Sequence, residues 1–434
     1  MSVKLFGNSR KPRLEKNEKR KTEKKKEKRT VLDKIISVFL VLVTLEAMYC
    51  TAVFSNLPII SDLRTMYIDT AMSTMRHHWL ATYFIPPAVV NAVTDQIAKA
   101  REAQIGVNTG WNQGAKGGNN KNEAPTAEPD LTEAEMDSMA PDEREFYNVF
   151  PEIDPKSMEL YVKANPLIIK DGWDHISINE AGLDDEGTDI MTRQGDRVLA
   201  LDVKNQIVLL RVTGNGYRGV LALCKDPARV SIQPGPGIGS YGSYAGDIAE
   251  AHNGILAITA SGFIDNGGTG NGGTLAGYAM CNGTEYGSAH MNWGYKRAEL
   301  HKDDLLYITD AQAAVSADTR DAVEFMPALI VDGEVIVDED CGWNGINPRA
   351  VIGQNSDYAM MMLVIEGRQT YSIGTGVVEC AEILHRYGGM QAMNLDGGSS
   401  AIMWYDGEYV TRCGNRALPK GRPMPNAFVY EAAE

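Results

Sequence analysis

The residues best suited to chemistry in this chain of 434 residues lie far apart in the sequence. One group forms a turn-like stretch between two apolar runs, with the sequence Asn394-Leu395-Asp396-Gly397-Gly398-Ser399-Ser400. Such a turn can present the Asp396 carboxylate while glycine N–H groups and serine hydroxyls receive an oxygen of a phosphate or a sugar. An ordinary hairpin turn is the simpler interpretation of the same residues.

A second candidate segment joins an apolar strand to a polar loop that contains Gly262 and Asp265 and continues into the glycine-rich residues 267–277. Glycine allows the backbone to approach a ligand closely and to aim N–H groups at an anion. The P-loop pattern G-x-x-x-x-G-K-[ST] is absent from the sequence, so nucleotide binding of that kind is not supported. A glycine-rich surface loop without a ligand is the alternative.

Two arginines in polar settings, Arg349 and Arg422, make up the third group. A guanidinium group binds phosphate through two parallel hydrogen bonds, which makes both residues candidates for an anion clamp. An exposed arginine with no ligand is the competing interpretation for each.

Elements that could position these residues are predicted from residue 158 onwards. Asp-Gly or Lys-Asn pairs separate apolar runs, which is typical of β-hairpins. A helix is expected around Val377, with Gly388-Gly389 ending it. Hairpins with a few segregated helices indicate an α+β fold with a mixed or antiparallel sheet. The predicted hairpin strands are 198–203 with 207–212, 328–331 with 334–337, and 402–405 with 408–410.

The N-terminus has the opposite charge from the rest of the chain. The formal net charge is −15, yet residues 1–34 contain 14 Lys+Arg and 5 Asp+Glu. Residues 35–54 follow, and 16 of these 20 are apolar, enough for a helix of roughly 30 Å. We expect a single transmembrane helix with a cytoplasmic N-terminus and an extracytoplasmic body. A cleaved signal peptide and a buried core helix are the alternatives, and Glu46 is the residue that least fits a span.

The composition of the remaining chain indicates its organisation. A helical juxtamembrane stalk is expected over 55–105, broken at Pro86-Pro87, then a flexible Gly/Asn/Pro-rich linker over 106–157 and a domain over 158–434. The six cysteines are scattered without a C-x-x-C pair, so no disulfide framework and no thiolate metal site is predicted. With 44% hydrophobic residues, the chain is neither collagen-like nor wholly disordered. The basic head is too short and too mixed in sign to be a nucleic-acid-binding domain.

In order, these segments resemble the phosphodiester glycosidase family, in particular its bacterial exopolysaccharide biosynthesis branch. The shared features are a strand followed by Ser-Gly-Phe and Asp265, an Arg-x-x-x-Gly segment at Arg349, the NLDGGSS stretch, and a Gly-Arg-Pro-x-x-Asn ending that contains Arg422. The resemblance covers about residues 205–431. Two departures are Thr259, where the family commonly has Asn, and two glycines after Asp396, where the family often has three.

The resemblance implies hydrolysis of a sugar-1-phosphodiester at the sugar C1–O bond, with an oxocarbenium-like transition state. Asp396 is the expected general base or electrostatic stabiliser, and Asp265 is the second candidate. Arg349 and Arg422 would clamp the phosphate, while Glu379 and His385 are reserve acid–base candidates. A divalent cation such as Ca²⁺ stays open, because Asp265, Asn266 and Asp396 carry oxygen ligands. The other expected substrate-binding residues are Gly262, Asn394, Gly397, Gly398, Ser399 and Ser400.

The expected function is therefore that of a membrane-anchored, extracytoplasmic glycosidase acting on an N-acetylglucosamine-type sugar-1-phosphodiester in envelope or exopolysaccharide metabolism. Its expected partners are that substrate or an envelope polysaccharide, and membrane lipid around the anchor, with no nucleic acid. The alternative is a non-catalytic scaffold or a protein that binds envelope glycan or another anionic polymer. A third hypothesis is a transferase that moves a glycosyl-phosphate group onto a wall polymer.

Overall fold

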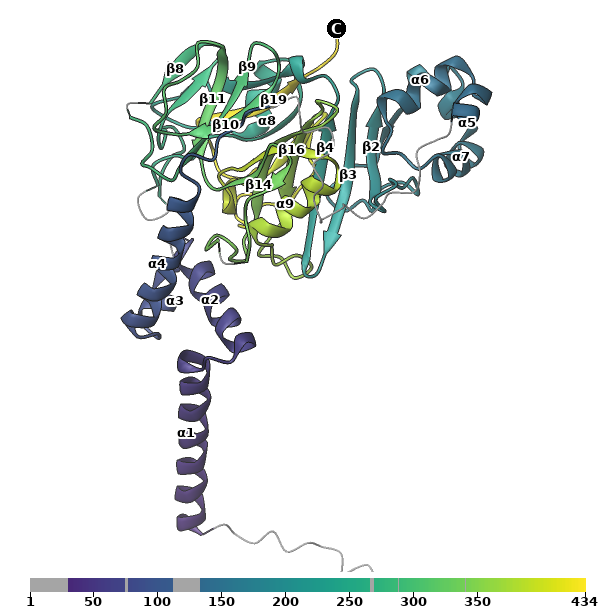
Figure 1. Ribbon diagram of the computed structural model, residues 1–434. Coiled ribbons are helices and arrows are strands. Elements are labelled where there is room, and N and C mark those ends of the chain that lie inside the picture. The colour runs from purple at the N-terminus through teal and green to yellow at the C-terminus, as the bar shows by residue number, and fades with distance from the viewer. Residues whose placement is uncertain (1–29, 75–76, 112–132, 266–268, 288, 340) are drawn as a thin grey trace, which may run out of the picture. The chain divides into compact units, whose positions relative to one another are not determined.

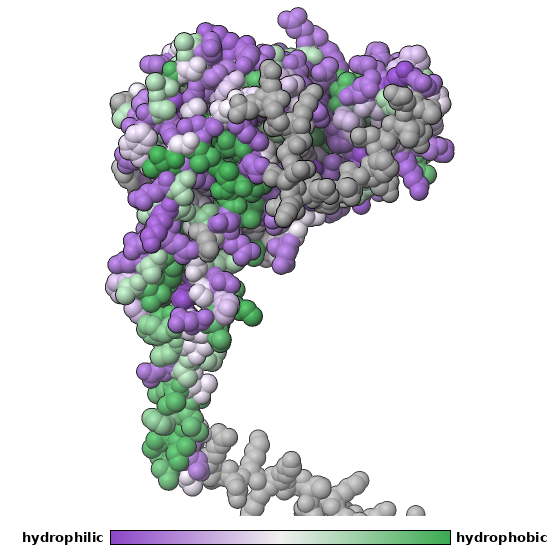
Figure 2. Space-filling model, in the orientation of Figure 1, coloured by the Kyte–Doolittle hydropathy of each residue, from purple (hydrophilic) through white to green (hydrophobic). Residues whose placement is uncertain are grey.

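The first described residue, Thr30, caps the helix α1 (Val31–Phe54). The Asp33 N–H donates to the Thr30 hydroxyl at 3.2 Å, and the Thr30 N–H donates to the Asp33 carboxylate at 2.8 Å, which completes a capping box. The helix has 24 residues and a mean hydropathy of 2.0, so its length and composition suit a membrane span, as they would also suit a signal sequence. It contains the span predicted over 35–54, and its surface is hydrophobic along most of its length (Figure 2).

The computed structural model describes residues 30–74, 77–111, 133–265, 269–287, 289–339 and 341–434. Residues 1–61 and residues 62–434 form two separate units. The second unit combines helices with three β-sheets, which confirms the predicted α+β class (Figure 1). Besides α1, the described helices are α2 (Pro58–Met72), α3 (His78–Thr82), α4 (Pro87–Ala103), α5 (Glu133–Ser138), α6 (Pro141–Val149), α7 (Pro155–Ala164), α8 (Ala245–Ala251) and α9 (Val377–Arg386).

The largest sheet has nine strands in the order β1-β2-β3-β4-β15-β14-β16-β12-β13. The other two have five strands each, in the orders β10-β9-β11-β7-β8 and β18-β17-β6-β19-β5. Neighbouring described strands pair antiparallel throughout. The strands are β1 (Ser177–Asn179), β2 (Arg197–Asp202), β3 (Ile207–Gly214), β4 (Tyr217–Cys224), β5 (Val230–Pro234), β6 (Gly254–Thr259), β7 (Ala279–Cys281), β8 (Thr284–Tyr286), β9 (Lys296–His301), β10 (Leu306–Asp310), β11 (Thr319–Phe325), β12 (Ala328–Val331), β13 (Glu334–Val335), β14 (Arg349–Asn355), β15 (Met360–Ile365), β16 (Gly389–Asn394), β17 (Met403–Tyr405), β18 (Glu408–Tyr409) and β19 (Asn426–Glu431).

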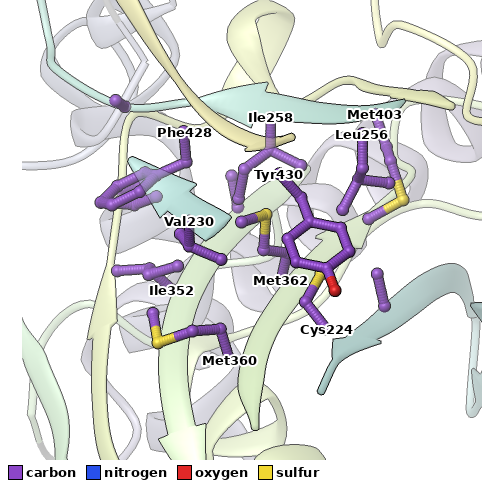
Figure 3. Packing of buried hydrophobic residues seen from close by; sticks show 14 of the residues in the cluster. Cys224, Val230, Leu256, Ile258, Ile352, Met360, Met362, Met403, Phe428 and Tyr430 are labelled. Atoms are coloured by element: carbon purple, nitrogen blue, oxygen red, sulfur yellow. The ribbon is translucent and has the colours of Figure 1, made fainter. Parts of the chain in front are cut away.

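Both faces of the nine-stranded sheet are buried at its centre, since every residue of β14 and β15 is buried and side chains of a strand point alternately to its two faces. On β15, Met360 and Met362 face a core shared with Ile258 of β6 and Phe428 of β19, as Figure 3 shows. The intervening Met361 faces a second core on the other side. The second core is covered by α9, together with residues from α6 and α7, while α8 covers the outer face of the β6 sheet. These layers hold the strand ends that carry the candidate site.

The three hairpins predicted from turn pairs are confirmed as β2–β3, β12–β13 and β17–β18. Asp332-Gly333 and Asp406-Gly407 both adopt positive φ at both residues, the conformation that makes such pairs suitable for a two-residue hairpin turn. The helix expected around Val377 is α9, and Gly388, at φ +75°, follows its end.

The helices after Ser61 belong to the same unit as the sheets, so the segment expected to be a stalk packs as part of the domain. The buried side chain of Gln104, just after α4, donates to Ala328 O at 2.9 Å and accepts from Ala328 N at 3.1 Å. On α2, Asp69 accepts a hydrogen bond from Gly345 N at 2.5 Å. The break expected at Pro86-Pro87 is where α4 begins.

The linker predicted over 106–157 is shorter in the structure. Thr109 N donates to Ile308 O at 2.9 Å, and the Trp111 indole N–H donates to Leu306 O at 2.9 Å, so residues up to 111 are bound to the sheet edge. At the other end, α6 begins at Pro141, and its Phe146 is buried with Phe150 in the second core.

Replacement of Gln104 by Ala should destabilise the chain by about 2–4 kcal/mol, because it leaves both buried backbone groups of Ala328 without their partner. The measurement is urea denaturation of the full chain in detergent, followed by circular dichroism. Glu102→Ala, at an exposed position on α4, is the matched control and should stay within about 0.5 kcal/mol. Equal midpoints for the two variants would contradict the role given to Gln104.

Candidate active site

Antiparallel pairing of one strand with two neighbours gathers the candidate residues. β6 pairs with β17 through Ile258 and Met403, and with β19 through Thr259 and Ala427. Because both neighbours run opposite to β6, their starts lie beside its end. The loop after β6 carries Asp265, the segment before β17 carries Asp396 to Ser400, and the segment before β19 carries Arg422. Three parts of the chain that are distant in sequence therefore meet at one edge of the sheet.

Arg422 and Asp265 form an ion pair across this edge, with side chains that are 16% and 11% exposed. Arg422 also donates to Gly270 O at 2.6 Å, and its guanidinium carbon lies 4.5 Å from the centre of the Phe263 ring. Gly270 N in turn donates to Asp265 at 2.8 Å. The pair thus holds Gly270 in place, and both charged groups already have partners before any ligand binds.

Asp396 lies in the same electrostatic cluster but has different partners. Burial raises the pKa of Asp396 to about 6, while a hydrogen bond from Ser400 and the charge of Arg422 act in the opposite direction, and Asp265 adds to the rise. The residue is partly buried. A carboxyl group with this pKa exchanges a proton near neutral pH, as a general acid or base requires.

The turn after Asp396 is shaped by its glycines. Gly398 has φ +61°, a conformation that favours glycine, and its N–H donates to Pro348 O at 3.0 Å. A Cβ atom on Gly397 would lie 2.7 Å from the same oxygen, so only glycine allows this close approach. The turn is therefore held against the start of β14, with Ser399 partly buried and Ser400 buried.

Three buried polar oxygens at the ends of β6 and β16 have no hydrogen-bond partner among the described residues. They belong to Thr259, Ser261 and Asn394, whose exposure is at most 1%. Asn394 is oriented by its amide group, which donates to Met326 O at 2.7 Å. Because buried polar groups are normally paired, these oxygens are candidates to bind water or a polar ligand. Thr259, where the family commonly has Asn, thus still supplies a polar atom here.

The backbone of Arg349 lies next to the turn, but its side chain forms hydrogen bonds with other parts of the chain. The buried guanidinium group donates to Thr375 O at 3.1 Å, Trp343 O at 2.9 Å and Gly345 O at 2.5 Å. Burial lowers the pKa of Arg349, partly offset by nearby groups that include Asp69. The structure therefore brings Arg422, and not the guanidinium of Arg349, to the Asp396 cluster.

The remaining predicted residues are also separated by the fold. Gly262 is buried, and a Cβ there would lie 3.1 Å from the Phe325 ring, so this glycine makes room for packing. Glu379 accepts a hydrogen bond from the Tyr217 hydroxyl at 2.6 Å, and it lies with His385 on α9. The groups that shift the pKa of Asp396 are Ser400, Arg422 and Asp265, so neither reserve residue is coupled to it.

Arg368 is a residue at this edge that sequence patterns did not indicate. It follows β15, and its two terminal nitrogens lie 3.5 Å and 3.8 Å from the position that a Cβ atom on Gly398 would take. Only the fold could reveal it, because β15 pairs with the start of β14, which contacts the turn.

A metal site is not evident in the described part of the chain, where no group of three or more His, Cys, Asp or Glu side chains is placed to hold an ion. Asn266, one of the suggested Ca²⁺ ligands, lies outside the described residues. Asp265 is already paired with Arg422.

Comparison with known families identifies the domain that contains this edge. Residues 252–431 match the family model of the phosphodiester glycosidases. This part of the chain is therefore a phosphodiester glycosidase domain, as the resemblance implied, although the match begins later than residue 205. It supports a glycosidase-type hydrolase in general terms.

The individual proteins that match this chain have low sequence identity to it. An uncharacterised SPbeta prophage-derived protein of Bacillus subtilis (strain 168) is 26% identical over 174 residues, which is 38% of this chain and 26% of that protein. The chain thus spans about a quarter of that relative. The catalytic domain of zebrafish N-acetylglucosamine-1-phosphodiester alpha-N-acetylglucosaminidase, auto-inhibited by its pro-peptide, aligns at 17% identity and a TM-score of 0.43 over 52% of this chain and 82% of that one. A hypothetical protein from Synechocystis aligns at 12% identity and a TM-score of 0.39, over 54% and 63% of the two chains.

Asp396→Asn should stabilise the protein at neutral pH but not at pH 4. The raised pKa means that the folded chain binds the Asp396 proton more tightly than the unfolded chain, so stability falls as pH rises from about 4 to about 6. Above that range the ionised carboxylate costs roughly 1–3 kcal/mol, at about 1.4 kcal/mol per pKa unit. The measurement is the Tm of variant and wild type at pH 4 and pH 8.

The exposed Asp357, replaced by Asn, serves as the control and should show no pH-dependent difference in Tm. A lower Tm for Asp396→Asn than for the wild type at pH 8 would contradict the desolvated carboxylate.

Proposed function

We propose that this chain is a membrane-anchored glycosidase that hydrolyses an N-acetylglucosamine-type sugar-1-phosphodiester outside the cytoplasm, in envelope or exopolysaccharide metabolism. The main support is Asp396, a carboxyl group with a pKa of about 6 beside the Arg422–Asp265 pair, inside residues that match the glycosidase family model. The sugar, its partner group on the phosphate and the envelope role belong to the proposal.

In the proposed reaction, water attacks the sugar C1 and the C1–O bond to phosphate breaks, with its electron pair passing to the phosphate oxygen. Asp396, ionised above pH about 6, takes the proton of the attacking water. The leaving group is a phosphate monoester, which is stable as an anion, so it needs less protonation than an alcohol would. The negative charge of Asp396 also stabilises the oxocarbenium-like transition state.

The other residues hold the components in place. Arg422 compensates the charge of Asp265 and holds Gly270 through its carbonyl oxygen. The N–H groups of Gly397 and Ser399 and the Ser399 hydroxyl would face the phosphate oxygens, because the Gly398 N–H donates to Pro348 O and the Ser400 hydroxyl to Asp396. The unpartnered oxygens of Thr259, Ser261 and Asn394 would receive sugar hydroxyl or amide hydrogens. The phosphodiester, rather than a neutral glycoside, is favoured because the site combines anion-binding groups with one titrating carboxyl.

The full chain in detergent should release free sugar from UDP-N-acetylglucosamine or a simple N-acetylglucosamine-1-phosphodiester, detected by mass spectrometry. Asp396→Asn should lower kcat by about 10²–10⁴-fold. The value of kcat/KM should fall as the pH drops below about 6, where Asp396 takes up a proton. Asp357→Asn is the control and should turn over at the wild-type rate.

Full turnover by Asp396→Asn would contradict its role as the base. Sugar release only in the presence of an acceptor polymer would favour a transferase. Binding of the substrates by wild type and variant without turnover would favour the glycan-binding alternative.

For the anchor, we propose that α1 spans the membrane with the basic residues 1–34 in the cytoplasm. The full chain should then resist extraction from membranes by alkaline carbonate. In right-side-out vesicles, external protease should digest the region after α1 and spare an N-terminal tag. A chain shortened at its N-terminus and recovered free in the medium would instead indicate a cleaved signal sequence.

A further inference from the structure

Arg368 has a charged group that the described structure leaves poorly compensated. Its one hydrogen bond from the guanidinium group within the described residues goes to Asn347 Oδ1 at 3.2 Å. The groups that shift its pKa are burial, which lowers it, and Cys413, so no carboxylate acts on it. The residue as a whole is exposed to solvent, although the guanidinium end of its side chain is the more buried part.

The backbone at Arg368 is held in an unfavourable conformation. Its φ of +58° is in the left-handed region that side chains other than Gly, Asn and Asp seldom adopt. Such strain persists only where the surrounding structure imposes it, and it concentrates at functional sites. Here Arg368 N donates to Ile373 O at 3.2 Å, and the neighbouring Gln369 amide group donates to Cys413 O at 2.9 Å.

A relay of hydrogen bonds orients the guanidinium group toward the glycine turn. The Asn347 amide donates to the hydroxyl of Ser73, the residue after α2, at 3.0 Å, which turns its oxygen toward Arg368. Asn347 itself is fixed by two backbone hydrogen bonds with Thr375, at 3.2 Å and 3.0 Å. Arg368 is therefore placed against Gly398 by groups that do not neutralise its charge.

The side chains of the other two arginines considered for this site already have hydrogen-bond or ion-pair partners. Arg349 donates to three carbonyl oxygens, and Arg422 pairs with Asp265. Arg422 N also donates to Ser399 O at 3.1 Å, while the Arg368 guanidinium lies near the neighbouring Gly398. The guanidinium group of Arg368 is therefore the uncompensated positive charge available to an anion at this turn.

We propose that Arg368 binds the phosphate group of the substrate at the Gly398–Ser399 turn, the position that sequence patterns assign to Arg349. This proposal rests on the proposed function for the identity of the anion. As the C1–O bond breaks, a phosphodiester with one negative charge becomes a monoester with two, so a guanidinium group here stabilises the leaving group more than the substrate. Asn347 is a positioning residue, since it acts through Arg368.

The first experiment measures anion binding without turnover. Inorganic phosphate and glycerol phosphate are titrated into the full chain in detergent by calorimetry at constant ionic strength. Arg368→Ala should weaken binding at least tenfold, and Arg368→Lys should weaken it less, because lysine keeps the charge but loses the two-pronged geometry. Arg144→Ala, which removes a half-exposed arginine on α6 paired with Asp137, is the control and should bind like the wild type.

A second variant separates binding from folding. Asn347→Asp keeps the shape of the side chain, and the Ser73 hydroxyl can donate to the new carboxylate. That carboxylate would pair with Arg368 and compete with the anion, so phosphate binding should fall about tenfold at unchanged Tm. With turnover, Arg368→Ala should lower kcat as well as kcat/KM, and the phosphate monoester product should inhibit the variant at least tenfold less well.

Unchanged phosphate affinity in Arg368→Ala, or no phosphate binding by the wild type, would overturn the proposal. Loss of phosphate binding in this variant, in a protein that hydrolyses no sugar-1-phosphodiester, would support the anion site while the proposed glycosidase function fails. If the wild type hydrolyses the substrate and Arg368→Ala does so equally well, the proposed glycosidase function is supported and the anion site at Arg368 is wrong.

Discussion

The candidate site depends on the pairing of β6 with β17 and β19. Both neighbours run antiparallel to β6, so the end of β6 and the starts of the other two strands share one edge. Asp265, the Asp396 turn and Arg422 lie in segments attached to these strand ends, and the hydrophobic residues of β6 and β19 anchor the edge in the main core (Figure 3). A shift of register by one residue would turn those core residues outward. The hydrophobic pattern therefore fixes the site as firmly as it fixes the sheet.

At that edge Arg422 interacts with the carboxylates of Asp265 and Asp396 to different extents. Arg422 forms its ion pair with Asp265, while Asp396 receives only a partial electrostatic effect from it and a hydrogen bond from Ser400. Asp265 is therefore engaged in an ion pair, while Asp396, whose pKa burial raises to about 6, is the carboxyl group suited to acid–base chemistry near neutral pH. The same division explains why a second arginine is needed for an anion: the charge of Arg422 is already compensated. Arg368, beside Gly398, is the residue in position to supply that charge.

Local patterns in the sequence were enough to predict the hairpins, α9 and the residues of the Asp396 turn, because turn chemistry and periodicity act over a few residues. Arg349 shows the limit of such patterns, since the direction of its guanidinium is set by carbonyls of Trp343, Gly345 and Thr375, which no spacing rule connects to it. Arg368 was missed for the same reason. The stalk prediction rested on helical spacing and the linker prediction on composition, and neither pattern registers single buried contacts such as that of Gln104 with Ala328. The α+β class was predictable because it needs only the types of the elements.

The family match covers residues 252–431, yet the structure places essential partners of that region outside it. β15 pairs with β4, so β1 to β4 continue the nine-stranded sheet beyond the matched residues, and without them β15 would become an exposed edge. On the other side, Asp69 and Thr70 of α2 and Ser73 just after it bind the segment before β14. That segment contains Asn347, the contact of Arg368. The position of Asn347, and through it that of Arg368 beside the turn, is thus set partly by α2 and Ser73, which precede the family domain in sequence.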